Sequence, residues 1–234
     1  MAKVLITREP SAAKQSTKTL ERAGHTPLLW PIFKVTDTGA TLPAKPYDGI
    51  IFTSNNAIKT LEARGWKPPH KNMKAWCVGK RTAEAAKQLG LEPIISKSGN
   101  AQELTKELGK LTEPCNILYP TTPDRGFDIK AALEGSNIIL EVLEIYQVLS
   151  LEFDVETVQK KLINTNPDIV FIYSHRSAQH LLNLIKSANI SQNMKSIELV
   201  AISENAAAPL EGIEWKTLKI ANCPEESAMI DLIS

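Results

Sequence analysis

Two short polar segments of this chain, Thr53-Ser54-Asn55 and Tyr173-Ser174-His175, lie 120 positions apart, and each follows an apolar run with the composition of a buried strand. In an open parallel sheet, the turns at the carboxyl ends of the strands line the ligand crevice. The helix that follows such a turn offers unpaired backbone N–H groups and favours anions. We therefore expect both segments to bind an anionic ligand. Helix capping by the two serines is the simpler interpretation, and it is compatible with binding.

Neither Ser54 nor Ser174 is predicted to be a nucleophile. The chain contains no Gly-x-Ser-x-Gly elbow, and His175 adjoins Ser174 in the sequence without an identifiable acid partner.

Basic residues stand just after strand-like runs or at helix entries, where charge-assisted hydrogen bonds to carboxylates are geometrically feasible. They are Arg8, Lys80, Arg81, Arg125 and Arg176. The alternative for each is a solvated surface charge. Arg8 and Arg125 are the preferred ligand-binding candidates. The glycine before Lys80, Gly79, would let a ligand approach that turn closely because it has no side chain.

Strand-like and helix-like segments alternate along the chain, which predicts an α/β fold with parallel sheets. Most of the strand-like runs are short and lack polar alternation, as expected for parallel strands covered on both faces. They are Val4–Thr7, Gly49–Thr53, Ala75–Val78, Glu92–Ile95, Ile117–Tyr119, Ile169–Tyr173, Glu198–Ile202 and Leu218–Ala221.

The two halves of the chain repeat one α/β unit. Tyr47 to Ser54 matches Pro167 to Ser174 at a shift of 120, and Asn72-Met73-Lys74 matches Asn193-Met194-Lys195 at a shift of 121. Two divisions into domains are compatible with this repeat. A tandem arrangement would divide the chain near residues 110–114, whereas pairing of two extended segments, Pro31–Pro46 and Glu141–Leu151, would make the residues between them an inserted domain.

Composition sets limits on function. The chain has 234 residues, 43% of them hydrophobic and 23% charged, and its formal charge of +1 gives no overall reason to expect nucleic acid or an anionic membrane as partner. No apolar run reaches the length of a membrane span. The three cysteines are scattered and the four histidines lack metal-ligand spacing, so we expect no metal site and a reduced, cytoplasmic protein.

The order and spacing of several segments resemble the uroporphyrinogen-III synthase family over nearly the whole chain. No single motif is sharp, and the duplication strengthens the match. The segments are Val4-Leu5-Ile6-Thr7-Arg8, Gly24 with Pro31 downstream, Ile51 to Ala57, Val78 to Ala83, Tyr146 after an apolar strand, and the segment around Ser174.

The resemblance implies two similar parallel-sheet, flavodoxin-like lobes joined by a two-stranded β ribbon. One domain would consist of residues 1–34 and 150–234, the other of residues 45–141, with residues 35–44 and 142–149 as the linker ribbon. This organisation favours the inserted domain over the tandem arrangement.

The resemblance also implies an activity, a hydro-lyase reaction of heme biosynthesis. The enzyme would cyclise the linear tetrapyrrole hydroxymethylbilane to uroporphyrinogen III, with inversion of the D ring and loss of water, without metal or organic cofactor. The expected partners are this substrate and, transiently, the upstream hydroxymethylbilane synthase, and the protein would be a monomer. A non-catalytic two-lobed binder of a small anionic ligand is the alternative, and a sugar- or nucleotide-binding enzyme is weaker because no Gly-x-Gly-x-x-Gly or P-loop is present.

Site residues follow from the same resemblance. Tyr146 is expected to donate a hydrogen bond to the departing hydroxyl of the substrate, although a tyrosine packed in the ribbon is the plainer interpretation. The second half departs from the family pattern at Ser203, which replaces the glycine of the first half, and at Ala206, which replaces a threonine. The predicted substrate-binding residues are Thr7, Arg8, Thr53, Ser54, Asn55, Gly79, Lys80, Arg81, Thr82, Arg125, Ser174, His175, Arg176, Ser203, Glu204 and Asn205.

Overall fold

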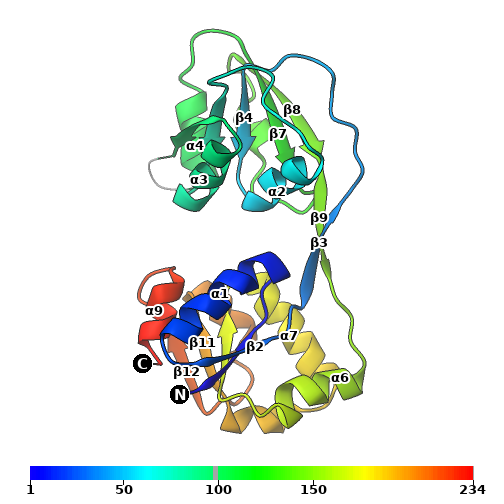
Figure 1. Cartoon of the computed structure of the whole chain (residues 1–234), viewed down its shortest axis with the longest axis vertical. Helices are drawn as coiled ribbons and strands as arrows, with labels where there is room; N and C mark the ends of the chain where they lie inside the picture. Colours follow the sequence, from blue (N-terminus) through cyan, green and yellow to red (C-terminus); the bar gives the residue numbers. More distant parts are fainter. Residues whose placement is uncertain (97–99, 234) are drawn as a thin grey trace. The chain divides into compact units, whose positions relative to one another are not determined.

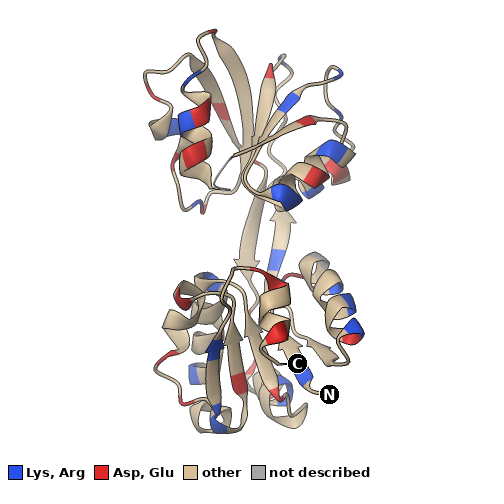
Figure 2. Ribbon diagram, turned by 90° about the vertical axis from the view of Figure 1, so that its left-hand side faces the viewer, with Lys and Arg blue, Asp and Glu red and all other residues tan. Residues whose placement is uncertain are grey.

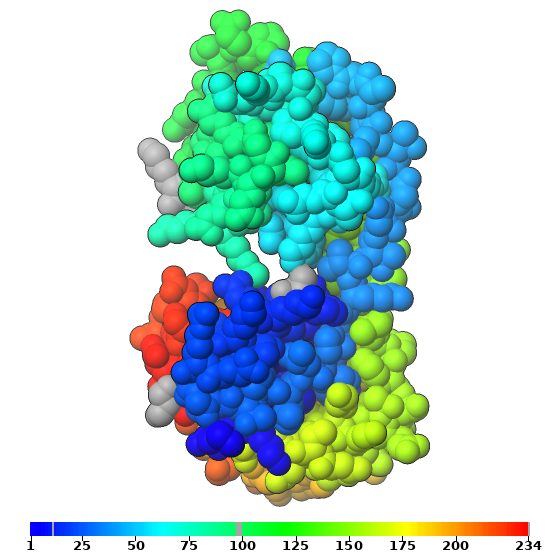
Figure 3. Space-filling view, in the orientation of Figure 1, coloured from blue at the N-terminus to red at the C-terminus, as the bar shows by residue number. Residues whose placement is uncertain are grey.

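The computed structural model describes residues 1–96 and 100–233. Contacts between Cα atoms divide the chain into two compact units. Unit 1 consists of Met1–Lys34 and Leu149–Ser234, and unit 2 of Val35–Val148. Figure 3 shows how unit 1 is assembled, because the blue surface of the amino-terminal segment lies against the yellow and red surface of the carboxyl-terminal one. In the part of the chain that the structure describes, no helix is long and apolar enough to cross a membrane.

Unit 1 contains a five-stranded parallel sheet (Figure 1). Its strand order is β12-β11-β10-β1-β2, so the amino-terminal strand β1 lies between β10 and β2. The strands are β1 (Lys3–Ile6), β2 (Thr26–Leu29), β10 (Ile169–Ile172), β11 (Glu198–Ala201) and β12 (Thr217–Ile220). The α-helices are α1 (Pro10–Arg22), α6 (Val155–Gln159), α7 (His175–Ser187), α8 (Glu204–Ala207) and α9 (Glu226–Asp231).

Unit 2 repeats this design with the order β6-β5-β4-β7-β8, again entirely parallel. The strands are β4 (Gly49–Phe52), β5 (Lys74–Cys77), β6 (Glu92–Ile95), β7 (Cys115–Thr121) and β8 (Ile138–Glu144). The helices are α2 (Asn55–Ala63), α3 (Lys80–Gln88), α4 (Ala101–Leu108) and α5 (Ile129–Ala132). Charged side chains lie mainly on helices and loops, whereas the strands are mostly uncharged (Figure 2).

A separate two-stranded sheet pairs β3 (Phe33–Asp37) with β9 (Tyr146–Ser150). Its strands are antiparallel, because Leu151 N bonds Ile32 O at 2.9 Å while Thr38 N bonds Ile145 O at 3.1 Å. Two parallel sheets and one two-stranded ribbon confirm the predicted fold class.

Matching side-chain contacts support the duplication. Asp48 precedes β4, and its carboxylate accepts a bond of 2.7 Å from the amide of Asn116 in β7. Asp168 precedes β10, and its carboxylate accepts one of 2.7 Å from the amide of Lys3 in β1. An aspartate therefore fixes the register of the same strand pair in both units.

Sheet edges were harder to predict than sheet centres. Every one of the eight predicted strands is present, but β2 was not predicted. The extended segment expected over Glu141–Leu151 is shared between β8, which ends at Glu144, and β9, which starts at Tyr146. β8 belongs to the sheet of unit 2 because it pairs with β7 along its whole length.

Candidate active site

The predicted site residues of unit 2 gather at one edge of its sheet. The strands β5, β4, β7 and β8 are neighbours and run parallel, so their carboxyl ends share one side, which we call the carboxyl edge of unit 2. The predicted site residues that follow these strands are Thr53, Ser54 and Asn55 after β4, Gly79, Lys80, Arg81 and Thr82 after β5, Arg125 after β7 and Tyr146 after β8.

Tyr146 contributes its phenol to this edge. Its ring packs in the hydrophobic core of unit 2, and the residue is only 3% exposed. Its side chain hydrogen-bonds that of Ser54, the N-cap of α2. Burial raises the pKa of the Tyr146 phenol above its usual value, while the bond from Ser54 acts in the opposite direction. The phenol therefore keeps its proton at neutral pH and has a partner for the phenolate.

A second tyrosine in this group was not predicted. Tyr119 in β7 is 2% exposed, and its hydroxyl lies 3.1 Å from the hydroxyl of Thr53. It is close enough to Tyr146 to raise the pKa of that phenol. The strand pattern carried no signal for this role, because an aromatic residue in a buried strand is expected in any core.

Two side-chain oxygens beside this group are buried without a hydrogen-bond partner among the described residues. They are Asn55 Oδ1, after β4, and Thr122 Oγ1, after β7. Unsatisfied buried polar atoms are rare in proteins and cost stability. Both atoms lie at the ends of neighbouring strands, and folding alone does not explain why they lack partners within the described part of the chain. This suits an edge that binds a polar ligand.

The turn after β5 has an unusual backbone. Gly79 has φ 82° and ψ 151°, and it occupies the N-cap of α3 without a side-chain bond. Lys80 and Arg81 are exposed, whereas Thr82 is buried. The first turn of α3 therefore presents two cations and uncapped backbone N–H groups.

Arg125 pairs with Glu144 at the end of β8, with 2.9 Å between Arg125 Nη1 and Glu144 Oε1. The same nitrogen donates to the carbonyl of Thr122 at 3.3 Å. Arg125 was expected to bind a carboxylate of the ligand. In the structure its guanidinium is paired with the carboxylate of Glu144.

The predicted residues of unit 1 also gather at one edge, formed by the carboxyl ends of β11, β10 and β1. Ser174 caps α7 in a full capping box with Ser177. His175 Nδ1 lies 3.0 Å from the carbonyl of Asn205, so the turns after β10 and β11 are in contact. Ser203 caps α8, a helix of only four residues, and Glu204 is exposed.

Arg8, after β1, forms a cluster with Tyr173 and Glu226. Its guanidinium lies 4.3 Å from the centre of the Tyr173 ring, and Nη1 lies 3.6 Å from Glu226 Oε1. The Tyr173 hydroxyl donates to the same carboxylate oxygen at 2.6 Å. Burial first, and then Glu226, raise the pKa of Tyr173. Nothing in the sequence indicated Glu226, which lies in the distant helix α9.

Two further predicted residues, Thr7 and Arg176, also have their side chains engaged within unit 1. Thr7 is 1% exposed, and its hydroxyl donates to the carbonyl of Phe171 at 3.3 Å. The guanidinium of Arg176 lies 5.4 Å from the centre of the Phe33 ring.

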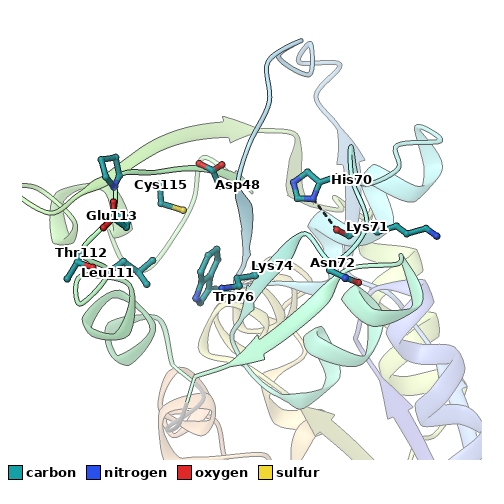
Figure 4. A pocket seen from close by; sticks show the side chains of 11 residues that line it. Asp48, His70, Lys71, Asn72, Lys74, Trp76, Leu111, Thr112, Glu113 and Cys115 are labelled. Atoms are coloured by element: carbon teal, nitrogen blue, oxygen red, sulfur yellow. Dashed lines mark hydrogen bonds between the residues drawn. The ribbon is translucent and has the colours of Figure 1, made fainter.

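A cavity of about 500 Å³ in unit 2 lies elsewhere (Figure 4). It is lined at the opposite, amino end of the strands by Asp48, Lys74 and Cys115, with the Trp76 ring among them. None of the predicted site residues lines it. Burial is the main reason why the pKa of the Cys115 thiol is raised, which favours the protonated thiol over the thiolate.

Fold and site together define a duplicated α/β protein whose polar and basic residues gather at the carboxyl edges of two parallel sheets. The model of the family described as uroporphyrinogen-III synthase HemD matches residues 14–231. The chain therefore belongs to the uroporphyrinogen-III synthase family. Membership makes it a cyclising lyase of tetrapyrrole biosynthesis that acts on a small molecule, and it removes the non-catalytic binder as an alternative.

Solved structures agree on the fold. The uroporphyrinogen-III synthetase of Helicobacter pylori 26695 is 16% identical, with a TM-score of 0.69 over 100% of this chain and 98% of that chain. A mutant uroporphyrinogen III synthase of the extremely thermophilic bacterium Thermus thermophilus is 15% identical, with a TM-score of 0.56 over 100% and 96% of the two chains. A search of curated proteins gives no match.

Proposed function

We propose that the chain converts hydroxymethylbilane to uroporphyrinogen III and that Tyr146 is the acid that starts the reaction. The observation that carries this proposal is the Tyr146 phenol at the carboxyl edge of unit 2, with its raised pKa and its bond to Ser54. A phenol keeps its proton at neutral pH and can therefore donate it to the leaving hydroxyl, while the Ser54 side chain offsets part of the effect by which burial weakens it as an acid. Ser54 also accepts a bond from Asn56 N at 3.2 Å, which leaves its own proton for the Tyr146 oxygen.

The proposed chemistry begins at the hydroxymethyl group. Its C–O bond breaks, the hydroxyl leaves as water with the proton of Tyr146, and the pyrrole becomes an electron-poor azafulvenium cation. The Ser54 hydroxyl stabilises the phenolate that remains. The substituted α-carbon of the terminal ring attacks to form a C–C bond and a spiro intermediate, which fragments and recloses with that ring inverted. The proton lost when the ring regains aromaticity returns to Tyr146, so the enzyme is regenerated.

Substrate carboxylates are the proposed ligands of both carboxyl edges. Charge-assisted bonds from the exposed Lys80 and Arg81 fit this role. Arg8 and Arg125 would contribute with the guanidinium donors that Glu226 and Glu144 leave open. The uncapped start of α3 adds backbone donors and the positive end of a helix dipole. Holding a flexible chain of rings in one conformation is a large part of the catalysis, because it favours attack by the substituted carbon.

We further propose that residues 1–34 with 150–234 form one domain and residues 45–141 the other, with residues 35–44 and 142–149 as the connecting segments, although residues 142–144 also complete β8 in the sheet of the second domain. The contact-based boundaries at Lys34 and Val148 support this division. A cytoplasmic monomer that receives its unstable substrate from the upstream synthase fits the same proposal.

The test is Tyr146→Phe, assayed with freshly made hydroxymethylbilane and separation of the type I and type III products. We expect the rate of type III formation to fall by about 10²-fold or more, the usual contribution of an acid catalyst. In the unaltered protein, activity should persist through neutral pH and decline only as the pH rises through the raised pKa of the phenol.

Tyr47→Phe is the matched control. Tyr47 lies in the same hydrophobic core and donates a bond of 2.8 Å to Glu141, but it precedes β4 and so lies at the other end of the sheet. Loss of the Tyr47 hydroxyl should leave the rate of type III formation unchanged. Equal rates for Tyr146→Phe and the unaltered protein would refute the role of Tyr146.

A further inference from the structure

Arg64, at the C-cap of α2, is bound on several sides within unit 2. Its Nε donates to Asp37 Oδ2 at 2.8 Å, and Nη2 bonds the other oxygen of that carboxylate. The guanidinium also donates to two carbonyls, those of Ala40 and Ile145, the latter at 3.4 Å. One side chain therefore holds the end of β3, the loop that follows it and the start of β9.

Ile145 is the point where the chain leaves one sheet and enters another. It lies between β8 and β9 and belongs to neither strand. Its amide donates to Thr121 O at 3.0 Å, at the end of β7, while its carbonyl accepts from Thr38 N at 3.1 Å and from Arg64. The peptide groups of Ile145 thus fix the direction in which the next side chain, Tyr146, projects.

This arrangement differs from an ordinary surface ion pair, which contributes little to stability. The Arg64 side chain is only 17% exposed. Its N–H groups donate to both oxygens of one carboxylate and to two backbone carbonyls. The bond to Arg64, the largest effect, and that to Gly39 lower the pKa of Asp37 to about 2, so the pair stays charged through the neutral range. A lysine could not reproduce this forked geometry.

In unit 1 the counterpart helix α7 meets the ribbon differently, since His180 Nε2 lies 3.0 Å from the carbonyl of Leu151. Helix α2 has nine residues and ends just before Arg64, whereas its counterpart α7 has thirteen. At the repeat shift of 120, the position of Arg64 corresponds to Leu184, which lies inside α7 and is buried. The shorter helix therefore places Arg64 at the ribbon in the unit that carries Tyr146, at a position that is buried inside the helix in unit 1.

We propose that Arg64 is a positioning residue for Tyr146, acting through the carbonyl of Ile145 with Asp37 as its anchor. The inference rests on the proposed role of Tyr146 as the acid. Removing the clamp would let the β8–β9 junction shift and move the phenol away from the departing hydroxyl. A misplacement of about 1 Å can cost up to 10²-fold in rate, so the effect falls on kcat more than on KM.

The experiment is a double-mutant cycle with Arg64→Gln and Tyr146→Phe. In the unaltered background, Arg64→Gln should lower kcat by about tenfold or more and change KM by less than about twofold. In the Tyr146→Phe background, Arg64→Gln should change kcat by less than about twofold, because the group it positions is gone. Equal fold-changes in both backgrounds would overturn the inference.

A second measurement separates this inference from the role of Tyr146 itself. Amide hydrogen exchange at Ile145 should be faster in Arg64→Gln, and also in Arg64→Lys, which keeps the charge without the fork. Lys195→Gln, which removes an exposed ion pair of 2.9 Å with Glu214 in unit 1, is the control and should alter neither exchange nor kcat. If Tyr146→Phe proved fully active, the proposed acid would fail, while unchanged exchange at Ile145 would refute the clamp.

Discussion

Hydroxyl groups have a double role at the edge of unit 2. Ser54 accepts the bond that caps α2 and donates towards Tyr146, so one side chain joins the stability of a helix to the chemistry proposed for the site. Capping and ligand-related roles are often treated as alternatives. Here the two lone pairs and one proton of a serine hydroxyl are enough for both.

Ser54→Ala separates the two roles. We expect the free energy of unfolding to fall by about 1 kcal/mol from the lost cap. We also expect kcat to fall by about tenfold or less, because the phenolate of Tyr146 loses one of its partners. Urea unfolding and the product-resolved assay measure the two effects on the same sample.

Asn100→Ala is the control for the cap alone. Asn100 caps α4 in the same unit, accepting from Glu103 N at 2.8 Å, and is not among the proposed site residues. The Asn100→Ala variant should lose a similar amount of unfolding free energy and keep an unchanged kcat. A Ser54→Ala enzyme with the stability loss and full kcat would show that Ser54 is a cap and nothing more.

The positions of many candidate site residues at strand ends could be predicted from the sequence, but their side-chain partners could not. Polar residues after apolar runs indicate strand ends, which is why the edge around Ser54 could be predicted from the sequence. Glu226 and Arg64 act through contacts with residues far away in the chain, and nothing beside them in the sequence identifies those partners. Arg64 in particular follows an ordinary amphipathic helix and has the pattern of a solvated surface charge.

At the scale of the element, two corresponding turns differ in backbone conformation: the turn after β5 in unit 2 and the turn after β11 in unit 1. Gly79 adopts φ 82° and ψ 151°, a region essentially restricted to glycine. Its counterpart Ser203 adopts φ −164°, an extended conformation open to any residue, and caps α8 with its side chain. Unit 2 thus gains exposed backbone at the start of α3, whereas unit 1 satisfies its helix start internally.

Gly79→Ala should expose this difference. No atom lies within 4 Å of the Cβ that alanine would add, so the cost comes from the backbone alone. We expect a loss of about 1–3 kcal/mol in unfolding free energy, or a shift of the turn that raises KM for the substrate. Thermal unfolding and steady-state kinetics measure these effects. Ser203→Gly is the comparison, and it should lose only a few tenths of a kcal/mol in unfolding free energy. If Gly79→Ala lost no more than that, with an unchanged KM, the backbone of Gly79 would not require glycine.

Two edge strands, β2 and β8, were missed for a physical reason. β2 is partly exposed along its length and contains Pro27, so it lacks the continuous apolar run of a central strand. β8 is also half exposed, and its alternating residues resemble those of the ribbon that follows. Central strands such as β4 and β10 are buried at every position and were predicted correctly.

At the scale of the whole molecule, the two units differ in continuity. Unit 2 is a single stretch, Val35–Val148, and its two hydrophobic clusters draw only on residues within that stretch. Unit 1 is built from two stretches, and its cluster combines Val4 and Ile6 of β1 with Phe171 and Val200. Because β1 lies inside the sheet of unit 1, the carboxyl-terminal stretch cannot complete its sheet alone.

This difference predicts unequal behaviour of fragments. A fragment of residues 35–148 should fold alone and unfold cooperatively in urea, with a stability in the range of about 0.05–0.15 kcal/mol per residue that is usual for a domain. A fragment of residues 149–234 should not, because it lacks the strand that pairs with β10 and leaves that strand's backbone groups open. Circular dichroism and urea titration distinguish the two outcomes.

Adding a peptide of residues 1–34 to the second fragment completes the test. The peptide supplies β1 and β2 with α1, and its side chains Val4 and Leu20 fill the cluster of unit 1. We expect the mixture to gain helix and sheet signal in proportion to complex formation, because folding and association are then one event. Independent folding of residues 149–234 without the peptide would mean that unit 1 does not depend on its amino-terminal strand, and the discontinuous domain would lose its physical basis.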